Sequence, residues 1–405
     1  MTDYEVVIVG GGVIGAALAL ELAGSDYRVA LVERRRPAFS SSNPERVIAL
    51  NHGSYVHLDQ LGVWRAMREQ GVGVIRHISV VEARGSEHVE MDAADAPGTA
   101  LPALGYVLEM GAMLRGLYTH LEQAGVKLLT SARVEGCAWE DDWANVRLQD
   151  GRCLRARLLV GADGSDSQLR RMAGIATMGW DYNRFAIVAS IRCAHEHQDT
   201  AYECFRKAGP LALLPLADGR YSIVWTMRPA EAAQLLRMDD QQVMRVLMRA
   251  MGERLVQATG EVFAISPRAC FSLELSIARR MTGPRLALVG NAAHTINPVA
   301  GQGMNLGLRD VRRLAWVLQA DYARRDPGQK IVLSAYAEQR WRDVAAVAAF
   351  TEGMVDVFGM TMPGMRQLRG RGMAMMQCLS PLRDMLLRHA AGIEQLEEAR
   401  VGTMA

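Results

Sequence analysis

The sequence predicts an α/β protein: a doubly wound domain on a parallel sheet, an inserted domain with a mixed β-sheet, and a helical C-terminus. Three observations predict it. Residues 4–33 read as strand, glycine-rich turn, helix and strand; residues 175–284 contain short strand-like segments with hairpin turns; and the chain is largely helical from Gln302 onward. With 405 residues and 50% hydrophobic composition, the chain can bury more than one core.

The first βαβ unit follows from the apolar pattern near the N-terminus. Residues 4–9 are rich in Val and Ile, which is typical of a strand buried on both faces of a parallel sheet. A helix is expected at about 14–23, and residues 28–33 form the next parallel strand. This order is that of a Rossmann-like domain.

A glycine motif of the form G-x-G-x-x-G lies between the first strand and the first helix. Gly10 permits the tight turn, Gly12 leaves room for a pyrophosphate, and Gly15 lets helix and strand pack closely. Glu33 ends the next strand, where a carboxylate accepts hydrogen bonds from ribose hydroxyls. The motif predicts a bound dinucleotide, but it does not distinguish NAD from FAD.

Turn signals divide the rest of the chain. A helix is expected around residues 53–69 and strands across 72–90, and the Asp-Gly pairs at 150–151 and 218–219 suit hairpin turns. A buried strand returns at 285–289. The expected division is residues 1–174 for the nucleotide-binding domain with substrate-side strands at about 72–110, 175–284 for the substrate domain, 285–350 for the return to the first domain, and 351–405 for a helical C-terminal region.

Two further motifs follow strand-like segments. Asp163 and Gly164 come directly after RLLV, where an aspartate in a turn accepts hydrogen bonds from backbone N–H groups. Asn291 follows the strand at 285–289, and small residues there allow close approach of a bulky ligand. A helix that begins near Gln302 directs its N–H groups at the same place.

The spacing of the three motifs resembles the flavoprotein aromatic hydroxylases related to p-hydroxybenzoate hydroxylase. Within that family the chain is most similar to the ubiquinone-biosynthesis branch, through RVIAL at 46–50, GPLALLPLADGRYSIVW at 209–225 and GNAAHTINPVAGQGMNLGLRD at 290–310. The GPLALLPL segment and PLRD at 381–384 look most like the 2-octaprenyl-6-methoxyphenol hydroxylase type. Most relatives have Gly-Asp where this chain has Gly-Asn; asparagine still binds a ribityl hydroxyl but removes one negative charge.

The resemblance implies an FAD-dependent monooxygenase. NAD(P)H reduces the flavin, O2 adds to give a C4a-hydroperoxide, and the distal oxygen is transferred to a polyprenylated phenol in ubiquinone biosynthesis. The expected contacts to the cofactor fall on Gly10, Gly12, Gly15, Glu33, Asp163, Gly164, Asn291, Pro298, Gly301, Gly303, Met304 and Asn305. Arg46 is expected to pair with the FAD pyrophosphate, the alternative being a solvated loop arginine.

The substrate is expected to meet an apolar wall. Leu214, Pro215 and Trp225 are the candidates for this wall, although the same residues suit plain core packing. His294 is the candidate catalytic side chain that donates to a substrate oxygen, with a structural role as the alternative. No Ser-His-Asp arrangement is expected, because the flavin carries the chemistry.

Charge and composition limit the partners. The net charge of +2 gives no broad field for nucleic acid, and the six scattered cysteines and the His195-x-His197 pair suggest no metal site. A cytoplasmic protein is expected. The methionine-rich stretch at 354–378 carries three arginines and no acid after Asp356. It suits peripheral contact with the inner face of the membrane or with a ubiquinone-biosynthesis protein complex; the alternative is packing on the FAD domain.

Two other functions fit the same motifs. One is an FAD monooxygenase that acts on another aromatic substrate. The other is a non-catalytic protein that uses the FAD fold for binding. Retention of a yellow cofactor and the accumulation of a quinone precursor in a deletion strain distinguish the three.

Overall fold

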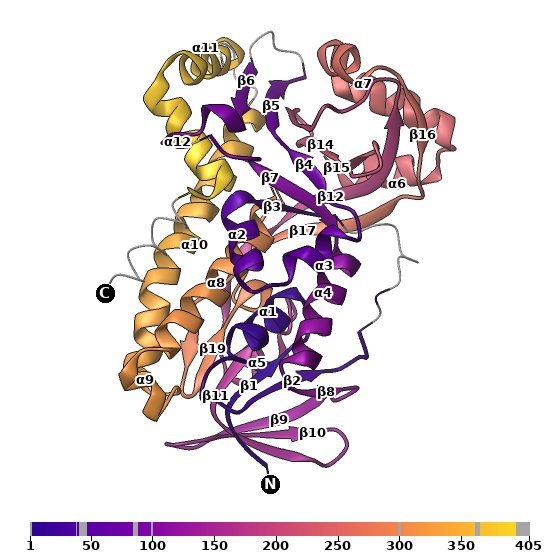
Figure 1. Ribbon diagram of the computed structural model, residues 1–405. Helices are drawn as coiled ribbons and strands as arrows, with labels where there is room; N and C mark the ends of the chain where they lie inside the picture. Colours follow the sequence, from indigo (N-terminus) through magenta and orange to yellow (C-terminus); the bar gives the residue numbers. More distant parts are fainter. Residues whose placement is uncertain are drawn as a thin grey trace.

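The fold has a parallel-sheet domain at one end and a larger mixed sheet at the other, with helices along one side (Figure 1). In this computed structural model the described residues are 2–37, 39, 47–83, 88–98, 100–298, 301–360 and 365–393. The predicted Arg46 contact therefore lies outside the described residues.

The parallel sheet runs in the order β18-β19-β11-β1-β2-β8. It contains the predicted strands as β1 (Thr2–Val9), β2 (Val29–Glu33) and β19 (Leu286–Leu288), with β11 (Cys153–Gly161) between β1 and β19. These four strands are parallel, so their carboxyl ends meet at one edge. The remaining strands of this sheet are β8 (Lys127–Thr130), β9 (Val134–Trp139), β10 (Ala144–Leu148) and β18 (Thr282–Gly283).

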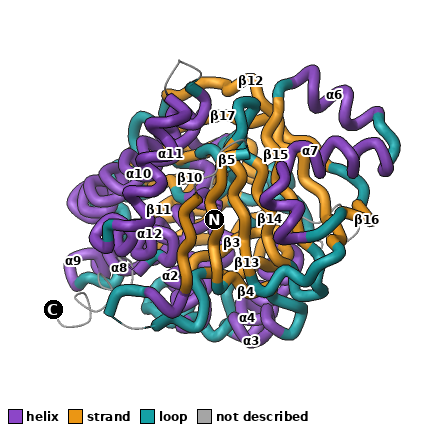
Figure 2. Tube along the Cα trace, turned by 90° about the horizontal axis from the view of Figure 1, so that it is seen from above, coloured by secondary structure: helices purple, strands orange, loops and turns teal. Residues whose placement is uncertain are grey.

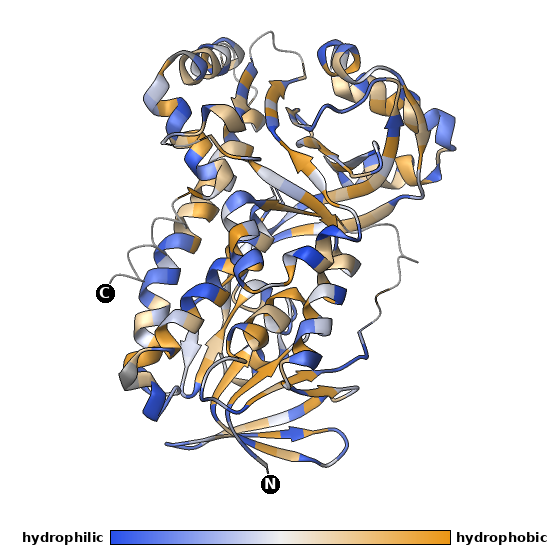
Figure 3. Ribbon diagram, in the orientation of Figure 1, coloured by the Kyte–Doolittle hydropathy of each residue, from blue (hydrophilic) through white to orange (hydrophobic). Residues whose placement is uncertain are grey.

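The helices pack on this sheet through apolar side chains. Val6, Ile8 and Leu31 from the strands share a core with Leu18 of α1 and Leu306 of α8, and Figure 3 shows the central strands of this domain mostly in the apolar colour. The burial of such side chains stabilises by about 25 cal/mol per Å² of apolar surface. The helices of this region are α1 (Val13–Glu21), α4 (Met110–Gln123), α5 (Gln168–Met172), α8 (Gln302–Leu318), α9 (Asp321–Arg325) and α10 (Lys330–Gly359).

The large sheet runs β20-β17-β12-β15-β14-β13-β5-β6, with β16 paired to β12. The predicted hairpin at 218–219 joins two of its strands, and Gly219 has φ +82° there. Its strands are β5 (His77–Glu82), β6 (His88–Asp92), β12 (Thr177–Cys193), β13 (Thr200–Phe205), β14 (Leu211–Pro215), β15 (Tyr221–Met227), β16 (Val262–Ile265), β17 (Ala269–Ala278) and β20 (His294–Thr295).

Helices lie on two sides of the large sheet. Figure 2 shows α6 (Pro229–Arg237) and α7 (Asp240–Thr259) on one side and α10 with α11 (Met365–Cys378) and α12 (Ser380–Ala391) on the other. The helical C-terminal region is thus packed beside β6, which α11 and α12 contact. No helix of the described residues is long and apolar enough to cross a membrane.

A small sheet links the two ends of the molecule. It has the order β3-β7-β4 and contains β3 (Val47–Asn51), β4 (Gly73–Ile75) and β7 (Gly105–Glu109). The helix predicted at 53–69 is instead two helices, α2 (His52–Gln60) and α3 (Trp64–Arg68). Gly62 lies between them with φ +77°, a left-handed conformation that ends α2.

Candidate active site

The three glycines of the turn after β1 have different structural roles. Gly10 has φ +109°, and a Cβ there would lie 2.3 Å from the Ala162 carbonyl oxygen. A Cβ on Gly15 would lie 1.9 Å from the Gly10 carbonyl oxygen, whereas nothing lies within 4 Å of a Cβ on Gly12. Gly10 and Gly15 therefore permit protein packing, and Gly12 leaves open space before the N-terminus of α1.

Glu33 is held beside this turn at the carboxyl end of β2. Its Oε2 accepts a hydrogen bond from Gly11 N at 2.6 Å, and its Oε1 accepts one from Arg35 N at 3.0 Å. The Tyr118 hydroxyl donates to the Gly11 carbonyl oxygen at 2.9 Å. Burial and the nearby Glu33 charge raise the pKa of Tyr118, so its hydroxyl remains a donor. The carboxylate is thus fixed where a ribose is expected.

The second motif is adjacent to the first. Ala162 N donates to the Val9 carbonyl oxygen at 2.8 Å, which joins the end of β11 to the end of β1. The Asp163 carboxylate accepts hydrogen bonds from the Ser167 hydroxyl and from the backbone N of Gln168 and Leu169. Asp163 therefore organises the start of α5, and Gly164 follows it with φ +85°.

The third motif reaches the same edge through its glycine. Gly290 has φ +58°, and a Cβ there would lie 3.1 Å from Ile14 Cγ1 at the start of α1. This contact places the Asn291 loop beside the glycine turn. Asn291 is exposed, so its side-chain amide is accessible to a ligand at this edge.

The loop that leads into α8 uses Asn305 to hold its shape. Asn305 Nδ2 donates to the carbonyl oxygens of Gly301 at 3.0 Å and Ala49 at 3.2 Å, and Oδ1 accepts from Asn51 N at 3.0 Å. Gly301 caps the helix with φ +62°. Pro298, Gly303 and Met304 flank this turn. Asn305 thereby joins α8 to β3, and its side chain serves to hold these two elements together.

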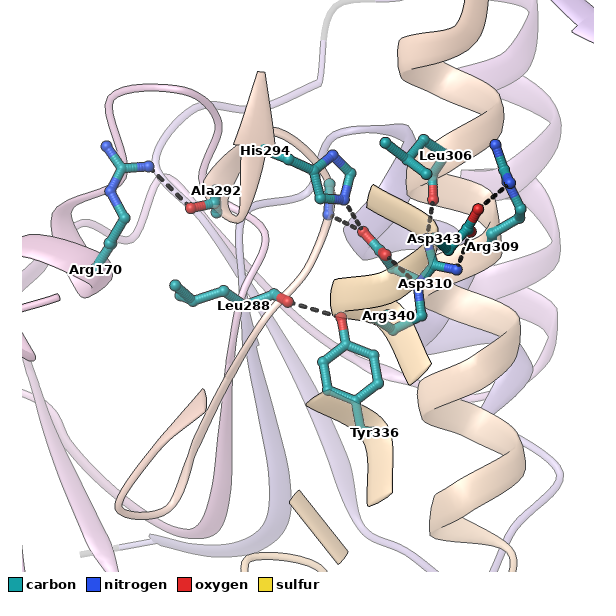
Figure 4. Close-up of polar contacts among 11 residues, drawn as sticks. Arg170, Leu288, Ala292, His294, Leu306, Arg309, Asp310, Tyr336, Arg340 and Asp343 are labelled. Carbon is teal, nitrogen blue, oxygen red and sulfur yellow. Dashed lines mark hydrogen bonds and ion pairs between the residues drawn. The ribbon is translucent and has the colours of Figure 1, made fainter. Parts of the chain in front are cut away.

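His294 belongs to a buried charge network (Figure 4). Its Nε2 donates to Asp310 Oδ2 at 2.6 Å, and the same oxygen accepts from Gly290 N at 2.7 Å. Arg340 Nε donates to Asp310 Oδ1 at 2.7 Å. Burial opposes ionisation of Asp310, but His294 and Arg340 outweigh it and hold the pKa of this carboxyl below its ordinary value.

Arg170 joins the second motif to the third. Its guanidinium donates to the carbonyl oxygens of Ser165 and Ala292, each at 2.8 Å. Figure 4 shows the contact with Ala292 on the side of the loop away from Asp310. The loop around Asn291 is therefore fixed from both sides, by Arg170 and by Asp310.

The three predicted wall residues lie on different faces of the large sheet. Trp225 is buried with Leu213, Leu247 and Leu255 in the core between the sheet and α7. Leu214 points to the opposite face, where it packs against the hydrophobic cluster that includes Leu387 of α12. Trp225 is thus a core residue. Side chains alternate along a strand, so the residues next to it on β15 project from the other face of the sheet. Pro215, at the end of β14, is buried.

Comparison with known proteins identifies the family. A family model described as FAD binding domain matches residues 3–351. The chain belongs to this FAD-binding family. It is 34% identical to ubiquinone hydroxylase UbiL of Rhodospirillum rubrum over 97% of this chain and 90% of that protein. It is also 34% identical to 3-demethoxyubiquinol 3-hydroxylase of Escherichia coli over 96% of this chain and 98% of that protein.

Solved structures of the same fold confirm the predicted fold class. The structure of p-nitrophenol 4-monooxygenase PnpA of Pseudomonas putida is similar with a TM-score of 0.77 and 20% identity, over 98% of this chain and 99% of that one. Pseudomonas aeruginosa PqsL, in complex with 2-aminobenzoylacetate, gives a TM-score of 0.76 and 23% identity over 92% of this chain and all of that one. The relatives also confirm the resemblance to ubiquinone-biosynthesis hydroxylases and the expectation of an FAD-dependent enzyme.

The residues of this FAD-binding protein fit the cofactor. Open space lies in front of Gly12, where a helix N-terminus attracts a pyrophosphate. Within the described part of the chain, Asn51 Nδ2, Asn297 Oδ1 and Gln302 Oε1 are buried and lack hydrogen-bond partners. A buried polar atom without a partner costs about 1–3 kcal/mol, so a polar ligand beside α8 is favoured.

Several residues that shape the site escaped sequence analysis. Tyr118, Arg170, Asp310 and Arg340 were not predicted, although Asp310 carried a signal. Asp310 lies four residues after Leu306 and four before Leu314, on the apolar stripe of α8, where a charge indicates a buried ion pair. Tyr118 and Arg170 reach partners far along the chain and carry no local signal.

Other sites receive no support from the described residues. Among them, no group of three or more His, Cys, Asp or Glu side chains could hold a metal ion. His195 and His197 lie in the loop between β12 and β13, and His197 Nε2 contacts the Leu216 carbonyl oxygen at 3.0 Å. The two histidines of the H-x-H pair therefore lie in a loop.

Proposed function

We propose that this protein hydroxylates the aromatic ring of a polyprenylated phenol in ubiquinone biosynthesis, with NAD(P)H and O2 as co-substrates. The proposal rests on one observation above others: identity of 34% extends across 97% of the chain to a ubiquinone hydroxylase. The three motifs that hold FAD in this family converge on one edge of the parallel sheet here. The names of the relatives and the geometry therefore point to the same chemistry.

The protein would hold FAD along the carboxyl ends of β1, β2, β11 and β19. Glu33 suits the ribose hydroxyls, the α1 N-terminus behind Gly12 suits the pyrophosphate, and Asn291 and Gln302 suit the ribityl chain and flavin. When bound, FAD supplies electron transfer from NAD(P)H and oxygen transfer from O2. Asp163 and Gly164, at the second motif, are proposed to contact both FAD and the nicotinamide.

The charge network keeps the loop around Asn291 in one shape. Asp310 accepts hydrogen bonds from Gly290 N and His294, so both ends of the Gly290–Ala292 turn are tied to α8. Because His294 already donates to Asp310, we assign it a positioning role. Its Nδ1 is buried and has no partner among the described residues, so this atom is the part of His294 left to meet a ligand.

The ring position that the protein hydroxylates is tested by analysis of the lipids of a deletion strain. We expect a strain that lacks this gene to accumulate a prenylated phenol or quinol one oxygen short of the next intermediate, identified by mass. Re-expression of the wild-type gene restores ubiquinone. A 2-octaprenyl-6-methoxyphenol-type precursor supports the hydroxylation predicted from the GPLALLPL and PLRD segments, and a demethoxylated quinol supports the activity named for the Escherichia coli relative. Unchanged ubiquinone levels contradict the proposal.

Peripheral contact with the membrane is part of the proposal. Leu368 and Met375 on α11 and Met385 on α12 have 62%, 56% and 57% of their surface exposed, and Arg371 is exposed on the same helix. α11 contains no acidic residue. Exposed apolar side chains with arginines suit the surface of an anionic bilayer, from which a polyprenylated substrate must come.

This contact is tested by flotation with vesicles of phosphatidylglycerol and phosphatidylcholine. We expect the wild-type protein to float with the vesicles at low salt, because each apolar side chain and each arginine adds to the binding energy. Leu368→Ser combined with Met375→Ser reduces the bound fraction about tenfold or more. The control is Phe263→Ser, an exposed apolar residue on β16. Equal flotation of all three proteins contradicts membrane contact through α11.

A further inference from the structure

A bulge interrupts β12 near the segment that leads into α8. The ladder between β12 and β17 is regular up to Asp181 and resumes at Arg184 with a shifted register, so Tyr182 and Asn183 are extra residues on β12. Asn183 has φ +48°, in the left-handed region that residues other than glycine rarely adopt. Its N–H donates to Asp181 Oδ1 at 2.7 Å, which stabilises this conformation. Bulges of this kind re-aim a side chain and are common next to active sites.

The re-aimed side chain is that of Tyr182, which has two partners on other elements. Its hydroxyl donates to Glu352 Oε1 on α10, and the Asn297 side chain is hydrogen-bonded to the same hydroxyl. Because the hydroxyl proton goes to Glu352, the donor in the second contact is the Asn297 amide N–H. Burial and the Glu352 charge raise the pKa of Tyr182, so the hydroxyl keeps its proton. We call these three side chains the Tyr182 network.

The strand register places Asn297 level with the bulge. Thr295 of β20 pairs with Ser276 of β17, and Ser276 pairs with Gly179 of β12. Both pairings are antiparallel, so β20 runs in the same direction as β12. Asn297, two residues after Thr295, is therefore level with the residues of β12 at the bulge. It lies in the third motif, directly before Pro298.

The Tyr182 network leaves one buried acceptor without a partner. Asn297 is 4% exposed, and its Oδ1 has no hydrogen-bond donor among the described residues. An amide has its donor and its acceptor on opposite branches, so an N–H end that is held by Tyr182 fixes the direction of the oxygen. A buried oxygen that is fixed and unpaired is costly unless a ligand supplies a donor.

We propose that Asn297 Oδ1 accepts a hydrogen bond from a ring N–H of the bound flavin, and that Tyr182 and Glu352 are positioning residues that fix the Asn297 amide for this contact. The inference rests on the FAD placement given under the proposed function. An isoalloxazine ring carries an N–H when oxidised and gains more on reduction, so an acceptor suits it in both states. An amide turned the other way would set its own N–H groups against those of the ring.

Glu352 links this contact to both domains. α10 reaches from the parallel-sheet domain to the large sheet (Figure 1). Val347 and Ala348 of α10 belong to the core of the parallel-sheet domain, whereas Phe358 stacks on Phe205 of β13 with ring centroids 4.0 Å apart. Glu352 lies between these two contacts along α10. The direction of the Asn297 amide therefore depends on how α10 is packed against both domains.

The test is FAD binding in a double-mutant cycle of Tyr182→Phe and Asn297→Leu. Apoprotein is titrated with FAD, and the visible spectrum of the bound flavin is recorded. We expect each single variant to weaken FAD binding by about twofold to tenfold, the effect of one hydrogen bond, and to shift the flavin spectrum. The double variant should bind FAD no more weakly than Asn297→Leu alone, because both changes remove the same contact.

Glu352 supplies a pair of variants with opposite expected results. Glu352→Gln keeps an oxygen that can accept the Tyr182 hydroxyl proton, so its FAD affinity and flavin spectrum should match those of the wild type. Glu352→Leu has no such oxygen, so it should bind FAD as weakly as Tyr182→Phe. These two variants also test the network if Tyr182→Phe fails to fold.

Tyr27→Phe is the matched control for lost stability. Tyr27 is another partly buried tyrosine, and its hydroxyl donates to the Leu318 carbonyl oxygen at 2.7 Å, before the amino end of β2 and so away from the cofactor edge. This variant should unfold more easily and bind FAD normally.

Three results would overturn the positioning role. The first is wild-type FAD affinity and spectrum in Tyr182→Phe and Glu352→Leu, with only a loss of stability as in Tyr27→Phe. The second is an additive cycle. The third is an effect that appears only after 2-farnesylphenol is added, because Asn297 would then contact the substrate and not the flavin. A wild-type apoprotein that takes up no FAD overturns the proposed cofactor site as well.

Discussion

Gly12→Val should give a folded protein that no longer retains FAD. No atom lies within 4 Å of a Cβ at this position, and Gly12 has ordinary extended dihedral angles, so the protein itself tolerates the side chain. The same side chain occupies the volume in front of α1 where the pyrophosphate approaches the backbone N–H groups. We expect FAD affinity to fall by at least about 100-fold, or about 3 kcal/mol, because several charge-assisted contacts are lost together.

The measurements are flavin absorbance of the purified protein and titration of the apoprotein with FAD. Gly24→Val is the matched control, since it also has open space and lies just beyond the other end of α1. It should stay yellow. Gly15→Ala is expected to fail differently, by misfolding, because its Cβ would lie 1.9 Å from the Gly10 carbonyl oxygen. A Gly12→Val protein with wild-type FAD affinity removes the basis for the cofactor site described above.

Asp310→Ala should destabilise the protein by about 3–5 kcal/mol, the cost of removing one partner from a buried ion pair. The Asp310 and His294 side chains are fully buried, and Arg340 is 6% exposed. Without the carboxylate, His294 and Gly290 N lose their acceptor, and Arg340 retains Asp343. The loop around Asn291 is then released, so FAD affinity falls together with stability.

The measurement is chemical unfolding followed by circular dichroism, with FAD titration of the folded fraction. Asp166→Ala is the control, because its ion pair with Arg171 is exposed and contributes less than about 1 kcal/mol. The sign with pH follows from the lowered pKa of Asp310. Its stabilisation is present above the ordinary pKa of 3.8 and is lost as pH falls toward its lower folded value. An unchanged unfolding midpoint in Asp310→Ala would mean that the network is not structural.

Sequence patterns within one segment were sufficient to predict most of the parallel-sheet domain. The strands at 4–9 and 28–33 and the glycines between them follow from apolar runs and backbone sterics, and the structure has them as β1, β2 and the turn at Gly10. The hairpin turns at 150–151 and 218–219 were predictable for the same reason. Each depends on residues a few positions apart.

The face of a sheet on which a side chain lies, and its contacts with residues distant along the chain, were not predictable in this way. Trp225 reads as a pocket wall in a strand pattern, but only the packing of α7 shows that its face is the core. The helix predicted at 53–69 ended early because Gly62 has φ +77° in the structure.

The sequence by itself determined the α/β fold class and the order of the three motifs, because these depend on local sterics and short spacings, and the resemblance carried by the motifs indicated the FAD family. Only the tertiary structure decided which motif residues meet a ligand and which serve the protein. Asp163 and Asn305 bind backbone groups, and Asp310 and Arg170 fix the loop around Asn291. The physical reason is that hydrogen bonds and burial are set by residues distant along the chain, which no local pattern specifies.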